Sequence, residues 1–370
     1  MTDAIHGALD ATELAGLCAK FPLGIADFAV NTNPYGPAPG VKEAVQRASL
    51  ERYPDQTARG LRDHWAEALG LDASEIAFGN GGADLIWAAC RAYLGPTRAL
   101  LTLEPTFSEA GDCANAMGAP HFSLPLFGEG LDFGHRPLPV TLVTETMRRI
   151  PSHVSLVYLC SPNNPTGAVW TELEIQALEE AIRPARLLLD RSFETLRMDH
   201  NASISNEPMS ARALFGIKAR PTRIEIRSFT KDFALPGIRI GAAFGARDEI
   251  ARCQRQLCPW SVSAPATMAA YALTDAETMA HLQVSRARWW VDAKRTFEGL
   301  EARGFRLVPS VVPFALVSTE LASAARTSLL EHGVHVRDCA SFGLPSFIRL
   351  AGRPEEDRER LFEALSSVFL

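Results

Sequence analysis

Short apolar runs alternate with stretches of helical periodicity through the first two thirds of the chain. A run in which almost every residue is apolar indicates a strand buried on both faces, as in a parallel sheet. Apolar residues spaced three or four apart indicate a helix that buries one face. Strands are predicted at residues 25–30, 76–78, 100–103, 154–160, 185–189 and 241–245, and helices at 41–50, 61–69, 85–93 and 172–182. This alternation favours an α/β fold in which helices cover both faces of a mainly parallel sheet.

The last third of the chain predicts a second, smaller unit. An apolar stretch at 260–273 and a long helix at about 282–303 lead away from the region of alternation. At 370 residues the chain exceeds one average domain, so a large and a small domain are expected. We predict a three-layer α/β/α large domain at 36–254 and a small α+β domain that combines 1–35 with 255–370.

Composition and charge exclude several classes of function. The chain has a net charge of −6 and no long basic run, which argues against nucleic-acid binding. No apolar run reaches membrane-spanning length, and residues 1–6 lack the charged-then-apolar layout of a signal peptide. The seven cysteines are scattered without a Cys-x-x-Cys pair, which is typical of reduced structural thiols. We therefore expect a cytoplasmic protein that binds neither membranes nor nucleic acid and holds no metal.

The stretch from 227 to 241 carries the strongest chemical signal. Lys231 follows a β-prone run and two hydroxyl residues, Ser228 and Thr230, and Arg239 comes eight positions later. A guanidinium group offers a planar fork for a phosphate, and a lysine amine condenses with an aldehyde. An amine, hydroxyls and a guanidinium at one point suit a phosphorylated aldehyde held as a Schiff base.

Polar residues follow three of the predicted strands. A glycine-rich turn at 79–84 opens a helix, whose free amides suit a phosphate. The turn is not a dinucleotide fingerprint, because Asp84 stands where a third glycine is expected. Asn164, in the run Asn-Asn-Pro-Thr-Gly, lies at a strand's carboxyl end, where α/β folds place their ligands. Asp190 directly follows another apolar strand, where a carboxylate is expected to have a partner.

The sequence around the lysine resembles that of a known family. Arg-Ser-Phe-Thr-Lys at 227–231, followed by Ala-Leu-Pro-Gly-Ile-Arg-Ile-Gly at 234–241, resembles the cofactor-lysine motif of the fold-type-I pyridoxal-phosphate enzymes in the aminotransferase class I/II superfamily. The resemblance covers nearly the whole chain. It implies that Lys231 holds pyridoxal 5'-phosphate and carries protons in catalysis, and that Asp190 pairs with the pyridine nitrogen. The other cofactor contacts that it implies are Gly82 and Ala83 through their amides, Phe107 by stacking, Asn164 at the phenolic oxygen, and Ser228, Thr230 and Arg239.

The resemblance also implies a shared active site and a set of substrate contacts. Family members are homodimers in which a tyrosine, here Tyr53, reaches the cofactor phosphate of the neighbouring subunit. Asn33 is a candidate substrate contact in the loop that covers the substrate. Arg349 would hold the substrate carboxylate by a bidentate pair. His6 and Arg337 would bind the phosphate or acid end of a phosphorylated substrate.

Two activities within the superfamily agree with the sequence. His6-Gly7, Phe193 and the triplet Arg337-Asp338-Cys339 resemble the decarboxylases that act on L-threonine O-3-phosphate in cobalamin synthesis. We therefore expect a lyase that forms (R)-1-amino-2-propanol phosphate and carbon dioxide. A histidinol-phosphate aminotransferase that uses 2-oxoglutarate is the alternative, since it too needs a cationic pocket for a phosphorylated amine.

A non-catalytic pyridoxal-phosphate regulator is a third class. It would require a DNA-binding module ahead of the site motifs, and roughly 30 residues precede them. One residue beside the predicted site departs from the family pattern, because Arg191 stands where glutamate is common. The sequence offers no physical reason for Arg191.

Overall fold

The computed structural model describes residues 7–9, 11–21, 23–126, 145, 152–197 and 209–369. His6, one of the predicted substrate contacts, lies outside the described residues.

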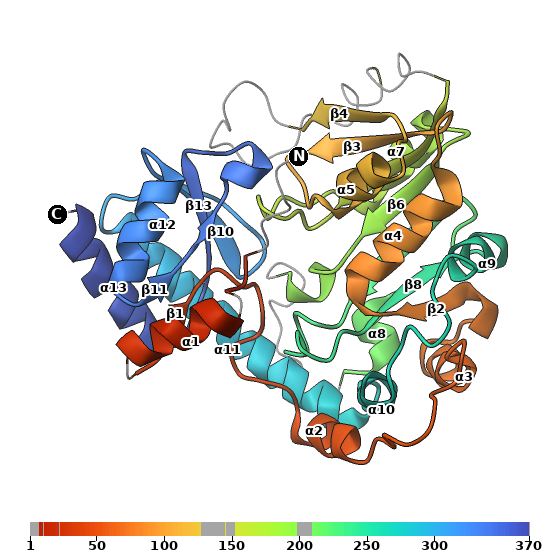
Figure 1. Ribbon diagram of the computed structural model, residues 1–370, viewed down its shortest axis with the longest axis horizontal. Helices are drawn as coiled ribbons and strands as arrows, with labels where there is room; N and C mark the ends of the chain where they lie inside the picture. Colours follow the sequence, from red (N-terminus) through yellow and green to blue (C-terminus); the bar gives the residue numbers. More distant parts are fainter. Residues whose placement is uncertain are drawn as a thin grey trace.

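A seven-stranded sheet forms the centre of the larger part of the molecule (Figure 1). Its strand order is β2-β8-β7-β6-β5-β3-β4, and every pair is parallel except the two that β8 makes with β2 and β7. This topology confirms the predicted α/β class with a mainly parallel sheet. The strands are β2 (Ile76–Gly79), β3 (Ala99–Glu104), β4 (His121–Pro125), β5 (Val154–Cys160), β6 (Arg186–Asp190), β7 (Arg223–Ser228) and β8 (Gly241–Gly245).

Alternate residues of the central strands pack against helices on opposite faces of the sheet. One face is covered by α4 (Gly81–Tyr93), α5 (Glu109–Ala116) and α9 (Arg247–Gln254), and the other by α7 (Glu172–Ala181). In β5, Leu156, Tyr158 and Cys160 join the first cluster, whereas Val157 and Leu159 join the second. This period of two is what a strand buried on both faces requires, and it produces the predicted three layers.

A third cluster covers the β2 and β8 end of the sheet, on the face opposite to α4 and α9. It is built from α2 (Pro39–Gln46), α3 (Arg59–Leu69), α8 (Ala211–Phe215) and α10 (Ala264–Ala272). Helix α10 packs on α2 and α3, and its buried alanines leave room for that close approach. Several buried residues that follow the predicted boundary at residue 254 belong to this cluster, among them Val262, Ala266, Ala269, Ala270, Ala272 and Leu273.

The smaller part is a four-stranded antiparallel sheet with helices packed against it. The strand order is β12-β13-β10-β9, and a separate parallel pair joins β1 to β11. The strands are β1 (Ala26–Asp27), β9 (Leu307–Val308), β10 (Phe314–Ser318), β11 (Val334–His335), β12 (Arg337–Asp338) and β13 (Phe347–Ala351). Apolar residues of α12 (Ala322–Glu331) and α13 (Glu355–Phe369) complete its core, as the small α+β prediction expects.

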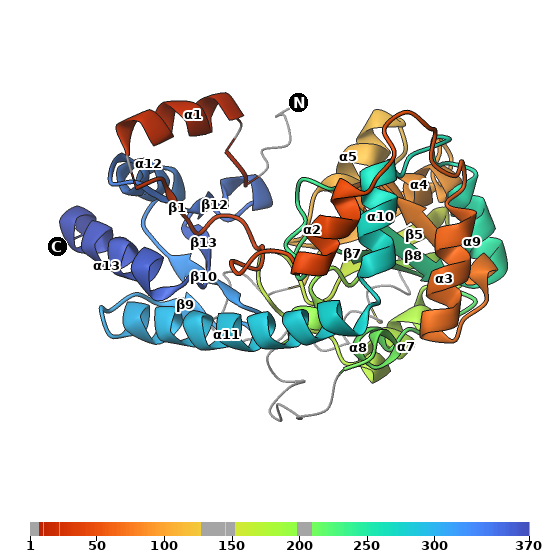
Figure 2. The ribbon, with the colours of Figure 1, turned by 90° about the horizontal axis from the view of Figure 1, so that it is seen from below.

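Helix α11 (Ala276–Glu301) connects the two parts, and Figure 2 shows it running beneath both. Helix α1 (Ala11–Lys20) lies on the smaller part (Figure 2), and most of its residues are exposed. The predicted strand at 25–30 is shorter than expected, because regular pairing ends at Asp27. Residues 28–33 continue as an irregular strap toward the larger part.

Candidate active site

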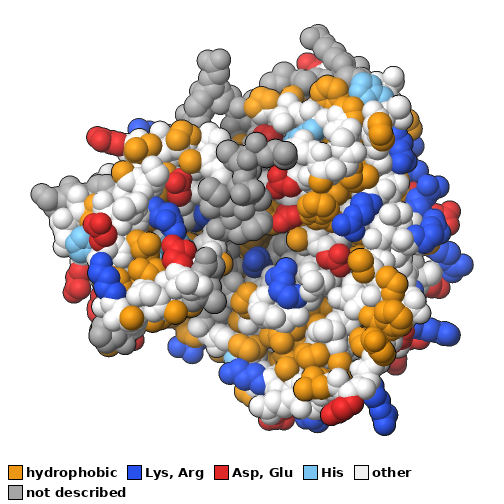
Figure 3. All heavy atoms as spheres, viewed as in Figure 1, with side chains coloured by type: hydrophobic (Ala, Val, Ile, Leu, Met, Phe, Trp, Pro, Cys, Tyr) orange, Lys and Arg blue, Asp and Glu red, His pale blue; other side chains and the backbone are white. Residues whose placement is uncertain are grey.

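A cavity of about 810 Å³ lies between the carboxyl ends of the large sheet and the small sheet. Figure 3 shows this face of the molecule hollowed near its middle, with Lys and Arg side chains beside the hollow. Most of the predicted site residues line the cavity although they come from distant parts of the sequence. They are Gly82, Ala83, Phe107, Asn164, Asp190, Ser228, Thr230, Lys231, Arg239, Arg337 and Arg349.

Lys231 lies three residues beyond β7, in a turn that aromatic packing holds in place. Phe229 and Phe233, two residues to either side, are buried with Trp65. The ring centroids of Phe229 and Trp65 are 4.9 Å apart in a stacked arrangement. The strap adds a backbone hydrogen bond, because Asn33 N donates to the Lys231 carbonyl at 2.9 Å. The lysine therefore projects from a rigid base.

The surroundings of Lys231 favour its neutral amine. Burial lowers the pKa of Lys231 to about 8, and the positive charges of Arg349 and Arg239 act in the same direction. Asp190 and Asp232 oppose this shift. A lysine with a pKa near 8 is neutral often enough at pH 7 to act as a nucleophile and a proton acceptor.

One corner of the cavity offers several hydrogen-bond donors. Gly82 and Ala83 lie in the first turn of α4, where backbone amides have no partner within the helix. The backbone packs closely here, since a Cβ on Gly82 would approach the Ser228 side chain to 3.3 Å. The Ser228 and Thr230 hydroxyls are 2.8 Å apart, and Arg239 completes the corner. Free amides, hydroxyls and a guanidinium around a helix N-terminus suit a phosphate monoester.

Asp190, at the end of β6, is buried on the side of the sheet that carries α4. Its Oδ1 accepts a hydrogen bond from Ser192 N at 2.9 Å. Burial raises the pKa of Asp190, while hydrogen bonds and the nearby Lys231 charge oppose the shift. A buried carboxylate that lines a cavity is suited to a ligand that presents a positively charged N–H group.

The two asparagines that follow β5 have different tasks. Asn163 is held by Thr106, the Pro105 carbonyl and Thr166, so its side chain fixes the loop. Asn164 lines the cavity, and its amide oxygen accepts a hydrogen bond from Arg349. The buried loop therefore places the second amide where a ligand can reach it.

Arg337 and Arg349 lie directly opposite each other on β12 and β13. Arg349 donates to the Ala29 carbonyl at 2.6 Å, and its Nε has no hydrogen-bond partner within the described part of the chain. Burial lowers the pKa of Arg349 to about 10, and burial also lowers the pKa of Arg337. Like charges on opposed strand positions repel each other, so an anion between them would be stabilising. This pair predicts an anionic substrate.

In the loop at residues 31–37, the structure places the predicted substrate contact Asn33 behind the cavity wall. The Asn33 amide donates to the Asp232 carbonyl at 3.0 Å and to Ser285 Oγ at 2.9 Å, and the residue does not line the cavity. Asn33 therefore secures the lysine turn and α11 to the strap. Asn31 lines the cavity instead, is 4% exposed, and neither polar atom of its amide has a hydrogen-bond partner within the described residues.

Arg353 explains why Asn31 and not Asn33 faces the cavity. Its buried guanidinium donates to the carbonyls of Asp27 at 2.6 Å and Thr32 at 3.4 Å, and also to the carbonyl of Val30. These bonds fix the path of the strap residue by residue. No local sequence signal indicates them, because the arginine lies more than three hundred residues away.

Arg191 lies on the α7 face of the sheet and does not line the cavity. Its guanidinium pairs with Glu172 at 2.7 Å, Glu194 at 3.4 Å and Glu225 at 3.8 Å. Arg223 pairs with Glu172 at 2.9 Å and so extends the same network. The three acidic partners explain an arginine where the family commonly has glutamate.

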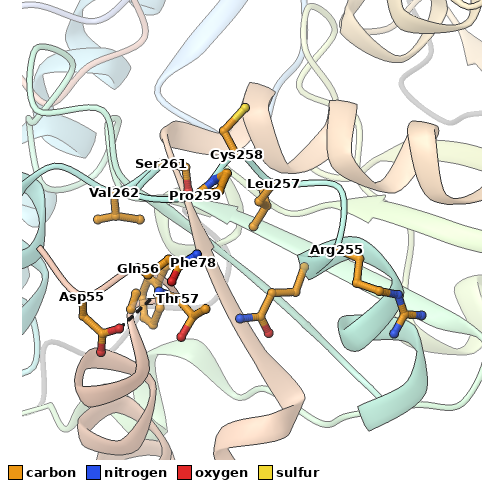
Figure 4. A pocket seen from close by; sticks show the side chains of 12 residues that line it. Asp55, Gln56, Thr57, Phe78, Arg255, Leu257, Cys258, Pro259, Ser261 and Val262 are labelled. Atoms are coloured by element: carbon orange, nitrogen blue, oxygen red, sulfur yellow. Dashed lines mark hydrogen bonds between the residues drawn. The ribbon is translucent and has the colours of Figure 1, made fainter.

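Tyr53 lies outside the cavity on the surface. Its side chain is 84% exposed, and its ring lies 5.2 Å from the ring of Trp260, which is 45% exposed. A second, smaller hollow of about 220 Å³ lies nearby, between the start of α3 and the segment that links α9 to α10 (Figure 4). Asp55, Arg255 and Cys258 are among its lining residues, and none of the predicted site residues is.

The described residues contain no group of three or more His, Cys, Asp and Glu side chains placed to hold a metal ion. Among the same residues, none of the helices has the length and apolar character needed to cross a membrane.

Comparison with known proteins identifies the family. Residues 24–365 match the model of the aminotransferase class I and II family. A histidinol-phosphate aminotransferase from Symbiobacterium thermophilum is 31% identical over 91% of this chain and 88% of that protein. Further curated relatives, 27–31% identical, carry the same name.

Solved structures share the fold at lower identity. A histidinol-phosphate aminotransferase from Sinorhizobium meliloti in complex with pyridoxal-5'-phosphate has a TM-score of 0.78 and 21% identity, covering 98% of this chain and 95% of that chain. An L-threonine-O-3-phosphate decarboxylase from Porphyromonas gingivalis has a TM-score of 0.72 and 22% identity. The match covers 92% of this chain and 98% of that chain. The family match agrees with the presence of Lys231 and of the hydrogen-bond donors around the α4 N-terminus. It confirms pyridoxal phosphate as the cofactor.

These findings correct the prediction of a lyase in cobalamin synthesis. Curated relatives at 29–31% identity are named histidinol-phosphate aminotransferases, whereas the decarboxylase is a structural neighbour at 22% identity and supports the fold alone. The triplet Arg337-Asp338-Cys339 does not distinguish the two activities, because an arginine at this position suits any anionic substrate.

Proposed function

The chain belongs to the aminotransferase class I and II family, and we propose that it transfers the amino group of histidinol phosphate to 2-oxoglutarate. The observation that carries the proposal is the opposed pair Arg337 and Arg349 in the cavity that holds Lys231. Histidinol phosphate has a phosphate and no carboxylate, so it needs a cationic site and offers no carboxyl group to lose. The names of the relatives at 31% identity support the same substrate.

The residues of the cavity divide between the cofactor and the substrate. The α4 N-terminus with Ser228, Thr230 and Arg239 would hold the cofactor phosphate. Asp190 would pair with the ring nitrogen and keep it protonated. When bound, pyridoxal phosphate takes up the amino group and accepts the electron pair released at the substrate carbon.

The remaining steps are proton transfers and anion binding by the chain itself. Lys231 Nζ, whose pKa burial lowers to about 8, would take the proton from the substrate carbon and deliver it to the cofactor. Arg337 and Arg349 would bind the phosphate of the first substrate and then a carboxylate of 2-oxoglutarate. One anion site can serve both substrates because a guanidinium fork accepts phosphate and carboxylate alike.

An assay with purified holoenzyme tests this function. With histidinol phosphate and 2-oxoglutarate together, we expect glutamate to accumulate over many turnovers, and with either compound alone no accumulation. Amino acids without a phosphate, offered with 2-oxoglutarate, should react with a KM at least roughly tenfold higher, since a charge-assisted contact is lost. Carbon dioxide release from L-threonine O-3-phosphate without a keto acid, and no glutamate from histidinol phosphate, would overturn the proposal.

We also propose that the enzyme is a homodimer with shared active sites, as the family resemblance implies for Tyr53. The exposed Tyr53 and Trp260 rings support an interface there, because large apolar side chains of this kind are common in protein contacts. Light scattering should give twice the mass of the 40.3 kDa chain.

Mixed variants test the sharing of sites. If the partner's Tyr53 completes each site, Lys231→Ala and Tyr53→Ala proteins mixed and allowed to exchange subunits should form dimers with one intact site. The mixture should then be more active than either variant alone. A monomeric mass would rule out shared sites. A mixture whose activity is only the average of the activities of the two variants would rule them out as well.

A further inference from the structure

Tyr158 and Asp190 are neighbours on the same face of the sheet. Tyr158 on β5 pairs with Leu188 on β6, so Asp190 lies two residues further along the neighbouring strand and points to the same side. Tyr158 OH donates a hydrogen bond to Asp190 Oδ2 at 3.1 Å. Tyr158 is fully buried and Asp190 is 4% exposed, so water does not replace this bond.

The two oxygens of the carboxylate receive separate donors. Ser192 N donates to Oδ1 at 2.9 Å, and Tyr158 donates to Oδ2. Two donors on different oxygens fix the plane of the carboxylate as well as its position. The Ser192 bond is local to the turn, whereas the Tyr158 bond ties the carboxylate to the middle of the sheet.

The charged and titratable groups around the pair favour a phenol that keeps its proton. Asp190 is faced by Tyr158 and Cys160 from β5 and by Lys231 from the turn after β7. Burial raises the pKa of Tyr158 well above its usual value, and the negative charges of Asp190 and Glu104 raise it further. The phenol therefore remains an O–H donor, and a donor to the ionised carboxylate stabilises that form.

We propose that Tyr158 is a positioning residue that holds Asp190 ionised and oriented toward the ring nitrogen of the cofactor. The inference concerns the cofactor site alone and does not depend on the amino-group donor. Tyr158 lies behind Asp190 and acts on the cofactor only through this carboxylate.

Tyr158→Phe removes the hydroxyl and keeps the ring. The chain supplies a matched control in Tyr93, which is buried in the same apolar cluster and whose hydroxyl has no hydrogen-bond partner within the described residues. Pyridoxal phosphate is titrated into each cofactor-free protein. We expect Tyr158→Phe to raise the dissociation constant about tenfold, and Tyr93→Phe to leave it unchanged. Equal constants for Tyr158→Phe and the parent would overturn the proposal.

The stability of the cofactor-free protein gives a second readout. Because burial already raises the folded-state pKa of Asp190, losing a donor raises it further and makes ionisation more costly in the folded state. The urea midpoint of Tyr158→Phe should therefore fall below that of the parent at neutral pH, and the gap should narrow as the pH falls through the pKa of Asp190. The difference in urea midpoint between Tyr93→Phe and the parent should be the same at every pH. A gap for Tyr158→Phe that does not change with pH would assign its hydroxyl to packing and overturn the proposal.

A double-mutant cycle separates action through Asp190 from a general effect on the fold. In an Asp190→Asn background, Tyr158→Phe should no longer change the dissociation constant of the cofactor, since the charge that the hydroxyl stabilises is gone. If Tyr158→Phe alone does not fold, the double variant should fold, because an uncharged amide tolerates the loss of a donor better than a carboxylate does. A full tenfold effect that persists in the Asp190→Asn background, or a double variant that also fails to fold, would contradict the proposal.

Discussion

Replacing Lys231 with alanine is expected to lower kcat by at least roughly 10³-fold, since the proton carrier and the attachment point of the cofactor are lost together. The turn around residue 231 should survive the change. Its stability comes from Phe229 and Phe233 in the aromatic cluster and from the Asn33 hydrogen bonds, none of which involves the lysine amine. Turnover with histidinol phosphate and the visible absorbance of the bound cofactor are the measurements.

The control for this variant is Lys294→Ala. Lys294 lies on α11, with a side chain that is 74% exposed and paired with Glu298 at 3.7 Å. An exposed pair of this kind contributes at most about 1 kcal/mol to stability, so this variant should match the parent in activity. A Lys231→Ala protein that kept its absorbance and turnover would place the chemistry at another residue.

Replacing Asp190 with asparagine is expected to weaken the enzyme and stabilise the empty protein. Without the carboxylate, nothing at this position holds the ring nitrogen protonated, so kcat should fall roughly 10²- to 10³-fold, the effect of breaking a buried charge pair. Cofactor affinity should fall as well. Because the folded-state pKa of Asp190 is raised, ionisation of its carboxyl group favours the unfolded chain. This penalty builds up as the pH rises from the unfolded-state pKa through the folded-state pKa, and asparagine removes it.

Asp63→Asn is the matched control for Asp190→Asn. Asp63 is exposed on α3, with its carboxylate 3.9 Å from Arg59, and its replacement should change neither turnover nor the dissociation constant of the cofactor. The urea midpoint of cofactor-free Asp190→Asn should exceed that of the parent at neutral pH and approach it in acid. An Asp190→Asn enzyme with parental kcat would show that the ring nitrogen needs no carboxylate here.

The strand ends were predictable because they depend on short-range pattern. The apolar runs that became β5 and β6 are buried on both faces, and a polar residue directly after such a run lies at the edge where ligands bind. Asn164 and Asp190 follow from this rule together with the family motifs. Lys231 and its flanking hydroxyls were equally clear, since the whole cluster lies within one continuous segment.

The strap was not predictable, because its path is set by residues distant in sequence. Asn31 and Asn33 are two positions apart in the same polar turn. Hydrogen bonds from Arg353 and Arg349 to the strap, and those of Asn33 to the lysine turn and α11, set which amide faces the cavity. The opposed placement of Arg337 and Arg349 depends on the register of β12 against β13. The presence of Arg191 is likewise explained by the fold, because α7 and β7 place Glu172 and Glu225 beside its guanidinium group.

The sequence motifs do not distinguish decarboxylation from amino-group transfer, and the reason is physical. The reaction would depend on how the substrate is oriented at the cofactor, and several residues would set that orientation together. A sequence motif identifies only one of these residues at a time. The arginine of the triplet at 337–339 meets the needs of a decarboxylase and an aminotransferase equally, so the triplet could not separate them.

Chemical trapping of the cofactor tests its attachment most directly. The chain has five lysines, at positions 20, 42, 218, 231 and 294, and borohydride reduction of the holoenzyme fixes the cofactor to whichever amine holds it. Peptide mapping by mass spectrometry should find the adduct on Lys231 alone, at one per chain. An adduct on any of the other four lysines, or no adduct in a protein that still forms glutamate, would contradict the site described here.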